Sequence, residues 1–321
     1  MTSSSRIGQT QVTVPNISYG ATALASMPDT YGYSVTEERG LDTIRAVLAQ
    51  PDGFIDTSRN YGLGKSEAMI GRVVRELGGW PAGRILSTKL DRDMDTRRFD
   101  AARARRSVEE SLSVLGVDRV QILHLHDPEY ALDLNEVTRP GGALGQLVRM
   151  KEEGLADAIG LAAGRVDVMM PILREWDLDV IITHSRYTLV NRNAEPLIEL
   201  ARSRGMSVLN AAPYASGALA KGAANHRRYV YQEATEEMLD PIRQVEAVCA
   251  RHNIPLGAAA LQFSLRDPRI ASTICGVSRP ERIAETMAWA DWPIPAEAWN
   301  ELLALPFGMD DPEATREYTP G

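Results

Sequence analysis

Four side chains able to hold or move a proton stand where apolar segments of the chain end. Asp56 and Tyr61 follow the first such segment, Lys89 ends the second and His126 ends the third. An ammonium beside a phenol favours the phenolate, so we expect Lys89 to lower the pKa of Tyr61. Tyr61 could then exchange a proton with a substrate oxygen, while Asp56 holds Lys89 in place and His126 orients the same oxygen. None of these groups is a good nucleophile, so a hydride donor or acceptor would come from a cofactor.

The segments that must carry these residues alternate between strands and helices. The predicted strands cover 17–22, 54–57, 85–89, 120–126, 158–161, 180–183, 207–210 and 272–275. The predicted helices cover 37–48, 67–77, 99–115, 144–153, 166–176, 194–204, 241–252, 256–265 and 280–289. The strands are apolar on both faces, which is typical of a parallel sheet covered by helices. About eight such units favour an α/β fold, a closed (β/α)8 TIM barrel, whose strand ends meet in one pocket.

We expect a single domain over residues 1–321, because no linker, composition shift or internal repeat divides the chain. Three segments are expected to lie outside the barrel pattern: a polar N-terminal arm (1–13), a loop insertion (217–240) and a polar C-terminal tail (306–321). Tyr31, Tyr33 and Trp299 are the aromatic residues that could overhang the pocket.

Composition limits the class of partner. The net charge of −8 argues against nucleic acid and anionic membranes, which both reward basic surfaces. No apolar run approaches the roughly 18 residues of a membrane helix, and the polar N-terminus lacks the apolar region of a secretory signal. The two cysteines, Cys249 and Cys275, make no disulfide framework, so a reducing cytoplasm is expected. We expect a small-molecule substrate and a monomer or homodimer.

His124 and His126 support a different hypothesis. They are two residues apart on a predicted strand, so their side chains share a face. A His-x-His pair at a barrel strand end can bind the metal of a hydrolase, with His184 as third ligand and Asp127 or Asp56 as carboxylate. This hypothesis leaves Tyr61 and the Asp56–Lys89 pairing without a role. We therefore favour the proton-transfer site and predict no metal ligands.

Three motifs in the expected order resemble the aldo-keto reductase superfamily: Asp56-Thr57-Ser58 through Tyr61-Gly62 to Glu67, then Ser87-Thr88-Lys89, then Leu125-His126-Asp127-Pro128. The resemblance runs from about Gly20 to Ala290. It implies a (β/α)8 barrel, a nicotinamide dinucleotide bound without a Rossmann domain, and a catalytic tetrad of Asp56, Tyr61, Lys89 and His126. The segments 125–128, 186–189 and 210–213 look most like the branch that contains D-threo-aldose (L-fucose) and pyridoxal dehydrogenases.

The same resemblance implies a set of cofactor-binding residues. Those expected near the nicotinamide are Gly20, Ala21, Thr22, Asp56 and His184; those along the pyrophosphate are Pro213, Tyr214, Ser216, Gly217 and Leu219; those at the adenosine are Gly276, Val277, Ser278, Arg279, Arg282, Glu285 and Thr286. The helix after 280 also offers an N-terminus to an anion.

The chain departs from the family's pattern at three places. Ala162-Ala163 replace a Ser-Asn pair that holds the carboxamide, and Ala211 replaces an aromatic that stacks on the nicotinamide. Gly276 replaces a lysine that meets the 2′-phosphate of NADP. These departures favour NAD slightly over NADP, although Arg279 and Arg282 could still hold a phosphate. His184 and Asn191 are the candidates to replace the lost contacts at the ring.

The predicted activity is NAD(P)-dependent oxidation of an aldose at C1 to the lactone, with Tyr61 accepting the hydroxyl proton. The first alternative is a pyridoxal or general aldehyde or ketone oxidoreductase. The metal-dependent barrel hydrolase is a second class of function. A nicotinamide-binding regulatory subunit with negligible turnover is a third, because some members of the superfamily are of that kind.

Overall fold

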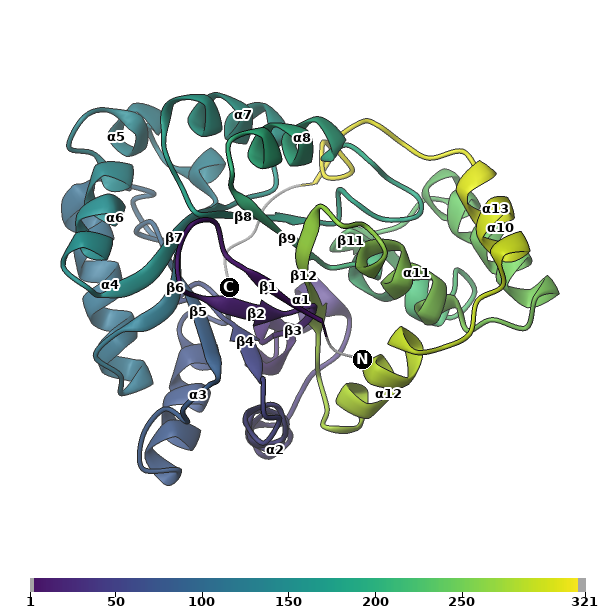
Figure 1. The fold of residues 1–321 in the computed structure, drawn as a ribbon, viewed down its shortest axis with the longest axis horizontal. Helices are drawn as coiled ribbons and strands as arrows, with labels where there is room; N and C mark the ends of the chain where they lie inside the picture. Colours follow the sequence, from purple (N-terminus) through teal and green to yellow (C-terminus); the bar gives the residue numbers. More distant parts are fainter. Residues whose placement is uncertain (1–2, 317–321) are drawn as a thin grey trace.

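The computed structural model describes residues 3–316, and its centre is a closed barrel of eight parallel strands in the order β12-β3-β4-β5-β6-β7-β8-β9 (Figure 1). The strands are β3 (Ile17–Gly20), β4 (Phe54–Asp56), β5 (Ile85–Leu90), β6 (Val120–His126), β7 (Ala156–Ala162), β8 (Val180–His184), β9 (Ser207–Ala211) and β12 (Ile270–Gly276). The prediction of a (β/α)8 TIM barrel in a single domain is confirmed. Each predicted strand is present, with ends that differ by at most two residues.

Helices surround the barrel in Figure 1, and most of them connect one barrel strand to the next along the chain. The outer layer contains α2 (Glu37–Leu48), α3 (Lys65–Glu76), α4 (Ala101–Leu115), α6 (Ala143–Glu152), α7 (Val166–Glu175), α8 (Glu195–Ser203), α11 (Leu256–Leu265) and α12 (Glu281–Ala290). Local chemistry fixes several of their ends. Thr36 and Asp100 accept hydrogen bonds from the backbone N–H groups of Arg39 and Arg103, which caps α2 and α4. Gly116 ends α4 at φ 72°, as the sequence predicts.

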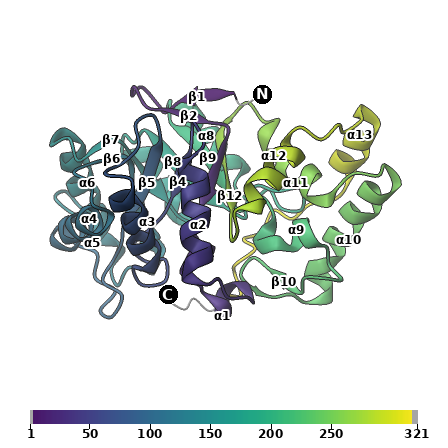
Figure 2. The ribbon, with the colours of Figure 1, turned by 90° about the horizontal axis from the view of Figure 1, so that it is seen from below.

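The N-terminal segment is a hairpin that closes one end of the barrel. β1 (Ser4–Arg6) pairs antiparallel with β2 (Thr13–Pro15). Although a polar arm was expected over 1–13, Ile7 is fully buried and Val12 is 7% exposed, and both pack on the inward-facing side chains of the barrel strands. Figure 2 shows this hairpin at the opposite end of the barrel from α1 (Pro28–Tyr31).

The expected loop insertion over 217–240 carries its own short elements. They are α9 (Ala218–Lys221), β10 (Arg228–Tyr229), β11 (Gln232–Glu233) and the first turn of α10 (Glu236–Arg251). We predicted this last helix to begin at Pro241, because proline favours the first helical turn. The helix begins earlier because the Thr235 hydroxyl accepts a hydrogen bond from the N–H of Met238.

Some helices and the path of the C-terminal tail were not predicted from the sequence. Helix α13 (Ala296–Ala304) packs beside α10, and a short helix, α5 (Leu134–Thr138), follows β6. Trp299 is buried in α13 beneath the guanidinium of Arg266. The expectation that it overhangs the pocket is therefore wrong. Beyond α13 the tail runs back across the barrel, where Gly308 pairs with Asn191.

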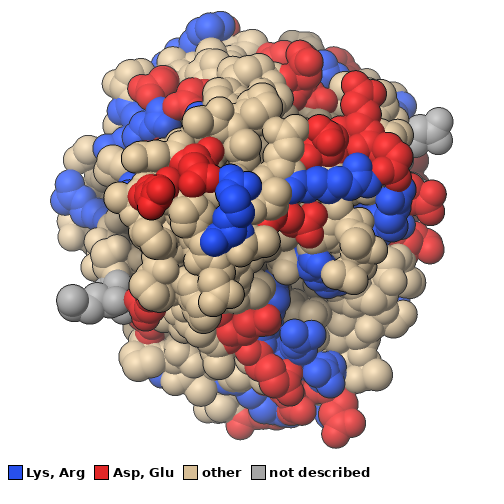
Figure 3. All heavy atoms as spheres, turned by 90° about the vertical axis from the view of Figure 1, so that its right-hand side faces the viewer, with Lys and Arg blue, Asp and Glu red and all other residues tan. Residues whose placement is uncertain are grey.

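The outer surface mixes charges of both signs. On the face shown in Figure 3, acidic and basic side chains are interspersed. Ion pairs also join neighbouring helices of the outer layer, such as the pair of Arg251 on α10 with Glu301 on α13. Within residues 3–316, none of the helices combines the length and the apolar character needed to cross a membrane.

Candidate active site

A cavity of about 560 Å³ opens at the carboxyl ends of the barrel strands. Asp56, Tyr61, Lys89 and His126 all line it, so the fold brings the predicted tetrad together. Register explains this convergence. Asp56 pairs with Ser87, two residues before Lys89 on β5, and Lys89 pairs with His124, two residues before His126 on β6, so the side chains of Asp56, Lys89 and His126 lie on the same face of the sheet. The aromatic residues Tyr31 and Tyr33 also line the cavity, as the sequence suggested.

Asp56 and Lys89 form a buried ion pair. The Lys89 Nζ donates to both carboxylate oxygens of Asp56, at 2.9 and 2.8 Å, and to the carbonyl of Thr57 at 2.6 Å. Lys89 is 1% exposed and Asp56 is 4% exposed. Ser87 donates a further hydrogen bond to Asp56 at 2.9 Å. The two Asp56 oxygens and the Thr57 carbonyl match the three N–H groups of the Lys89 ammonium, and together they fix its position.

Tyr61 lies beside this pair as a neutral phenol. The Lys89 Nζ stands 4.8 Å from the centroid of the Tyr61 ring, and the phenol shares a hydrogen bond with the side chain of Thr22. Removal from water, followed by the charge of Asp56, raises the pKa of Tyr61 well above its usual 10. The expectation that Lys89 lowers this pKa is therefore wrong. Burial of the phenol is the largest cause of its raised pKa, and the charge of Asp56, which pairs with Lys89, adds to it.

His126 stands between two carboxylates. Its Nδ1 lies 2.6 Å from Asp91 Oδ1, and its Nε2 lies 3.6 Å from Asp127 Oδ2. Burial alone would lower the pKa of His126, but Asp127 and then Asp91 raise it overall. The rings of His126 and Tyr61 meet edge to face at 5.8 Å between centroids. Sequence reasoning missed Asp91, although its position two residues after Lys89 places it on the same face of the chain.

The geometry does not assemble the metal site of the hydrolase hypothesis. His124 is fully buried, and its Nδ1 lies 3.3 Å from the hydroxyl of Ser87. Burial and the charge of Lys89 hold the pKa of His124 well below 6.5. His184 instead contacts Glu313 on the tail, at 3.3 Å. In the described span 3–316, no group of three or more His, Cys, Asp or Glu side chains is arranged to hold a metal ion.

The sequence model of the Aldo/keto reductase family matches residues 16–305. The chain belongs to the aldo-keto reductase family. It is 30% identical to D-threo-aldose 1-dehydrogenase of Pseudomonas sp., with 90% of this chain and 93% of the relative covered. It is also 29% identical to L-galactose dehydrogenase of Arabidopsis thaliana, over 95% and 89% of the two chains, and 26% identical to pyridoxal 4-dehydrogenase of Microbacterium luteolum, over 92% and 95%.

Solved structures show the same fold. An aldo-keto reductase of Bacillus halodurans in its holo form superposes with a TM-score of 0.76 at 20% identity, covering 99% of this chain and all of the other. The glycerol dehydrogenase of Gluconobacter oxydans superposes with a TM-score of 0.70 at 19% identity, over 93% of both chains. As an aldo-keto reductase, the protein is an oxidoreductase that uses a nicotinamide cofactor.

Most residues expected at the cofactor line the cavity of this aldo-keto reductase. The lining includes Gly20, Thr22, Asp56, His184, Tyr214, Ser216, Gly217, Gly276, Ser278, Arg279, Arg282 and Glu285. The remaining expected residues lie buried behind the wall, and these are Ala21, Pro213, Leu219, Val277 and Thr286. Asn60, Lys221, Tyr231 and Arg316 also line the cavity, although the sequence analysis did not name them as individual site residues. These come from loops and the tail, whose approach to the cavity follows no periodic pattern.

One end of the cavity suits an anionic dinucleotide. Lys221, Arg279 and Arg282 line it together with one carboxylate, Glu285, which pairs with Arg282 at 2.7 Å and with Arg279 at 3.5 Å. Burial and then the two guanidinium groups lower the pKa of Lys221, as expected for a cluster with excess positive charge. No heavy atom lies within 4 Å of a Cβ built on Gly276, which leaves room beside the backbone. The residues present therefore fit a bound nicotinamide dinucleotide.

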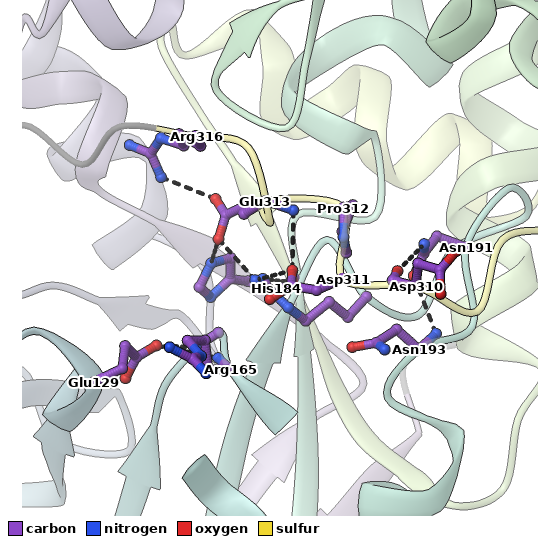
Figure 4. A network of polar contacts seen from close by, with 12 residues as sticks. Glu129, Arg165, His184, Asn191, Asn193, Asp310, Asp311, Pro312, Glu313 and Arg316 are labelled. Atoms are coloured by element: carbon purple, nitrogen blue, oxygen red, sulfur yellow. Dashed lines mark hydrogen bonds and ion pairs between the residues drawn. The ribbon is translucent and has the colours of Figure 1, made fainter. Parts of the chain in front are cut away.

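A network of polar contacts holds the C-terminal tail against the loops of the barrel (Figure 4). Arg186 on the loop after β8 donates to Asp311 at 2.6 Å and to Glu313 at 3.0 Å. Glu313 also meets His184, and Arg316 lines the cavity. Asn191, one of the two candidates for the ring contact, does not line the cavity in the described residues. Its amide donates to the carbonyl of Asp310 instead and so anchors the tail.

Proposed function

We propose that this aldo-keto reductase is an NAD-dependent sugar dehydrogenase that oxidises an aldose at C1 to the lactone. The observation that carries the proposal is the convergence of Tyr61, the Asp56–Lys89 pair and His126 on one cavity. The names of the similar proteins, D-threo-aldose 1-dehydrogenase and L-galactose dehydrogenase, support an aldose as the substrate.

The proton chemistry follows from the geometry. A bound nicotinamide supplies the hydride acceptor in oxidation and the hydride donor in reduction. Tyr61 and His126 are placed to hydrogen-bond the oxygen on the reacting carbon. Because Tyr61 is neutral, it is ready to donate its proton to a carbonyl oxygen. In oxidation it must first lose that proton, so the oxidation rate should rise with pH throughout the range in which Tyr61 remains neutral.

Glu285 supports NAD as the cofactor. Its carboxylate neutralises part of the charge of Arg279 and Arg282. A carboxylate can accept hydrogen bonds from ribose hydroxyls, whereas it repels a 2′-phosphate. The room at Gly276 points the same way, because no side chain there supplies a cation to a phosphate.

Polar acceptors at the other side of the cavity support a polyhydroxylated substrate. Asn60 and Asp127 line the cavity close to the tetrad and can accept hydrogen bonds from several hydroxyls.

The second candidate substrate is pyridoxal, which is favoured by the aromatic side chains of the cavity wall. There Tyr31 meets Tyr231 edge to face, with ring centroids 6.0 Å apart.

A spectrophotometric screen at 340 nm tests the proposal. NAD and NADP are each offered with L-fucose, D-arabinose, L-galactose, other aldoses and pyridoxal. Turnover of an aldose with NAD is expected, and pyridoxal turnover alone would select the second candidate. Tyr61→Phe should bind the cofactor as the wild type does while its kcat falls by about 10² to 10⁴. Wild-type turnover in that variant would contradict the role of Tyr61.

A further inference from the structure

We propose that Asp91 is a positioning residue for this reaction, one that fixes which nitrogen of His126 carries a proton and keeps the ring charged. The inference rests on the proposed function, because His126 matters only if it faces a reacting oxygen. It concerns a residue outside the tetrad, and it assigns to that residue a defined effect on the pH dependence of turnover.

The Asp91 carboxylate is held rigidly from both sides. Its Oδ1 lies 2.6 Å from His126 Nδ1, while its Oδ2 accepts from the Ser58 hydroxyl at 2.6 Å and from the backbone N–H of Asn60 at 2.9 Å. Asp91 is 1% exposed. Its backbone is also fixed, since its N–H donates to Ser107 at 2.9 Å. Burial would raise the pKa of Asp91, but the charge and hydrogen bond of His126 lower it, so the carboxylate is ionised.

An ionised carboxylate only accepts hydrogen bonds, so Nδ1 of His126 must carry a proton. In neutral His126 the Nε2 atom, which faces the cavity, then has only a lone pair. Nε2 becomes a donor when the ring is an imidazolium. A cationic donor at this place stabilises negative charge on the substrate oxygen in the transition state. Asp91 thereby couples the donor ability of His126 to its charge.

The groups around His126 shift its protonation equilibrium toward that charge. Asp91 and Asp127 attract the imidazolium, whereas Lys89 and the neighbouring His124 oppose it, and the neutral ring of Tyr61 completes the surroundings. The balance raises the pKa of His126 above 6.5. The donor is therefore present below this raised pKa and is lost as the pH rises through it.

Asp91→Asn gives an outcome that a merely structural role would not give. Ser58 and Asn60 both donate toward Oδ2, so the amide oxygen of the variant should occupy that position and its NH2 should face Nδ1. Nδ1 must then be the acceptor, and the proton moves to Nε2 of a neutral ring. Above the pKa of the variant's ring, the donor at Nε2 would persist without the positive charge. In the direction of carbonyl reduction, in which Tyr61 donates its proton, we expect kcat/KM to fall by about 10- to 10²-fold at neutral pH and its alkaline decline to disappear, with unchanged NAD affinity.

Nitrogen NMR of the histidine-labelled protein reads the same effect without turnover, and His126→Asn assigns the signal. In the wild type the proton should lie on Nδ1 above the pKa of His126. In Asp91→Asn it should lie on Nε2, and the pKa should be lower by about 1 to 3. Asp179→Asn is the matched control, because Asp179 binds Lys151 at 2.6 Å and the N–H of Ile159 at 2.8 Å, far from His126. It should leave the His126 signal and the pH profile unchanged.

Ser58→Ala keeps the test decisive if Asp91→Asn does not fold. Without the Ser58 donor, the charge of Asp91 acts more fully on His126, so the alkaline decline should move to higher pH, opposite in sign to Asp91→Asn. A wild-type His126 with its proton on Nε2 would overturn the inference, as would an unaltered pKa in Asp91→Asn. Absence of aldose turnover in the wild type would overturn the proposed function instead, and the NMR result would still decide the role of Asp91.

Discussion

Glu67 should make the stability of this protein fall as the pH rises. This carboxyl lies in the first turn of α3, is fully buried and accepts a hydrogen bond from Thr88 at 2.6 Å. Burial raises the pKa of Glu67 from 4.5 to about 7. The folded chain therefore binds the proton more tightly than the unfolded chain, and stability falls between about pH 4.5 and pH 7.

The size of the effect follows from the two pKa values. They differ by about 2.5, and at about 1.4 kcal/mol for each pKa unit the folded state loses about 3 kcal/mol across this window. Glu67→Gln keeps the acceptor for Thr88 and cannot ionise, so it should gain that amount over the wild type at pH 8 and almost nothing at pH 4.5. With about 2.1 cal/mol/K of unfolding entropy per residue, the Tm difference at pH 8 is about 4 °C.

Urea unfolding at several pH values is the assay. Glu76→Gln in the same helix is the control. A hydrogen bond from Arg45 holds the pKa of the exposed Glu76 below its usual value, so this variant should lose a little stability above that pKa. A stability difference between Glu67→Gln and wild type that does not change with pH would refute the reasoning.

Two further predictions concern the charges of the site. Lys89→Met leaves the carboxylate of Asp56 buried without its partner, so urea unfolding should show a loss of about 3 to 5 kcal/mol. Adding Asp56→Asn should recover part of that loss, and a double variant no more stable than Lys89→Met would contradict this account. Gly276→Lys places an ammonium where a Cβ meets no atom within 4 Å. It should raise the ratio of kcat/KM with NADP to kcat/KM with NAD about tenfold, or about 1.4 kcal/mol. Glu285→Gln should change this ratio in the same direction. An unchanged ratio in both variants would refute the role given to this end of the cavity.

The sequence predicted the barrel because each of its strands is a short apolar segment between amphipathic helices. The tetrad could be predicted for a related reason, since polar residues directly after such strands must meet at one end of a barrel. Glu67 shows where this reasoning stops. Its position in a motif was evident, but its raised pKa depends on complete burial, which no local pattern reveals.

The errors have identifiable physical causes. In the N-terminal hairpin, single apolar residues such as Ile7 stand among polar neighbours, so the segment has no local apolar pattern even though it packs on the barrel. Helix α13 could have been found, because Pro295 precedes it and Ala298, Trp299 and Leu302 recur at helical spacing. The tail could not, since ion pairs with Arg186 hold it in place and such long-range pairings leave no periodic signal.

The β1–β2 hairpin and Arg316 lie toward opposite ends of the barrel, and this decides how the enzyme should be handled. The hairpin of β1 and β2 lies at the end of the barrel away from α1 (Figure 2). Arg316, in contrast, lines the cavity together with Tyr31 of α1. An affinity tag or a tether to a solid support is therefore best joined at the amino terminus, because the cavity then still faces the solution. A bulky group attached close to Arg316 would instead crowd the cavity.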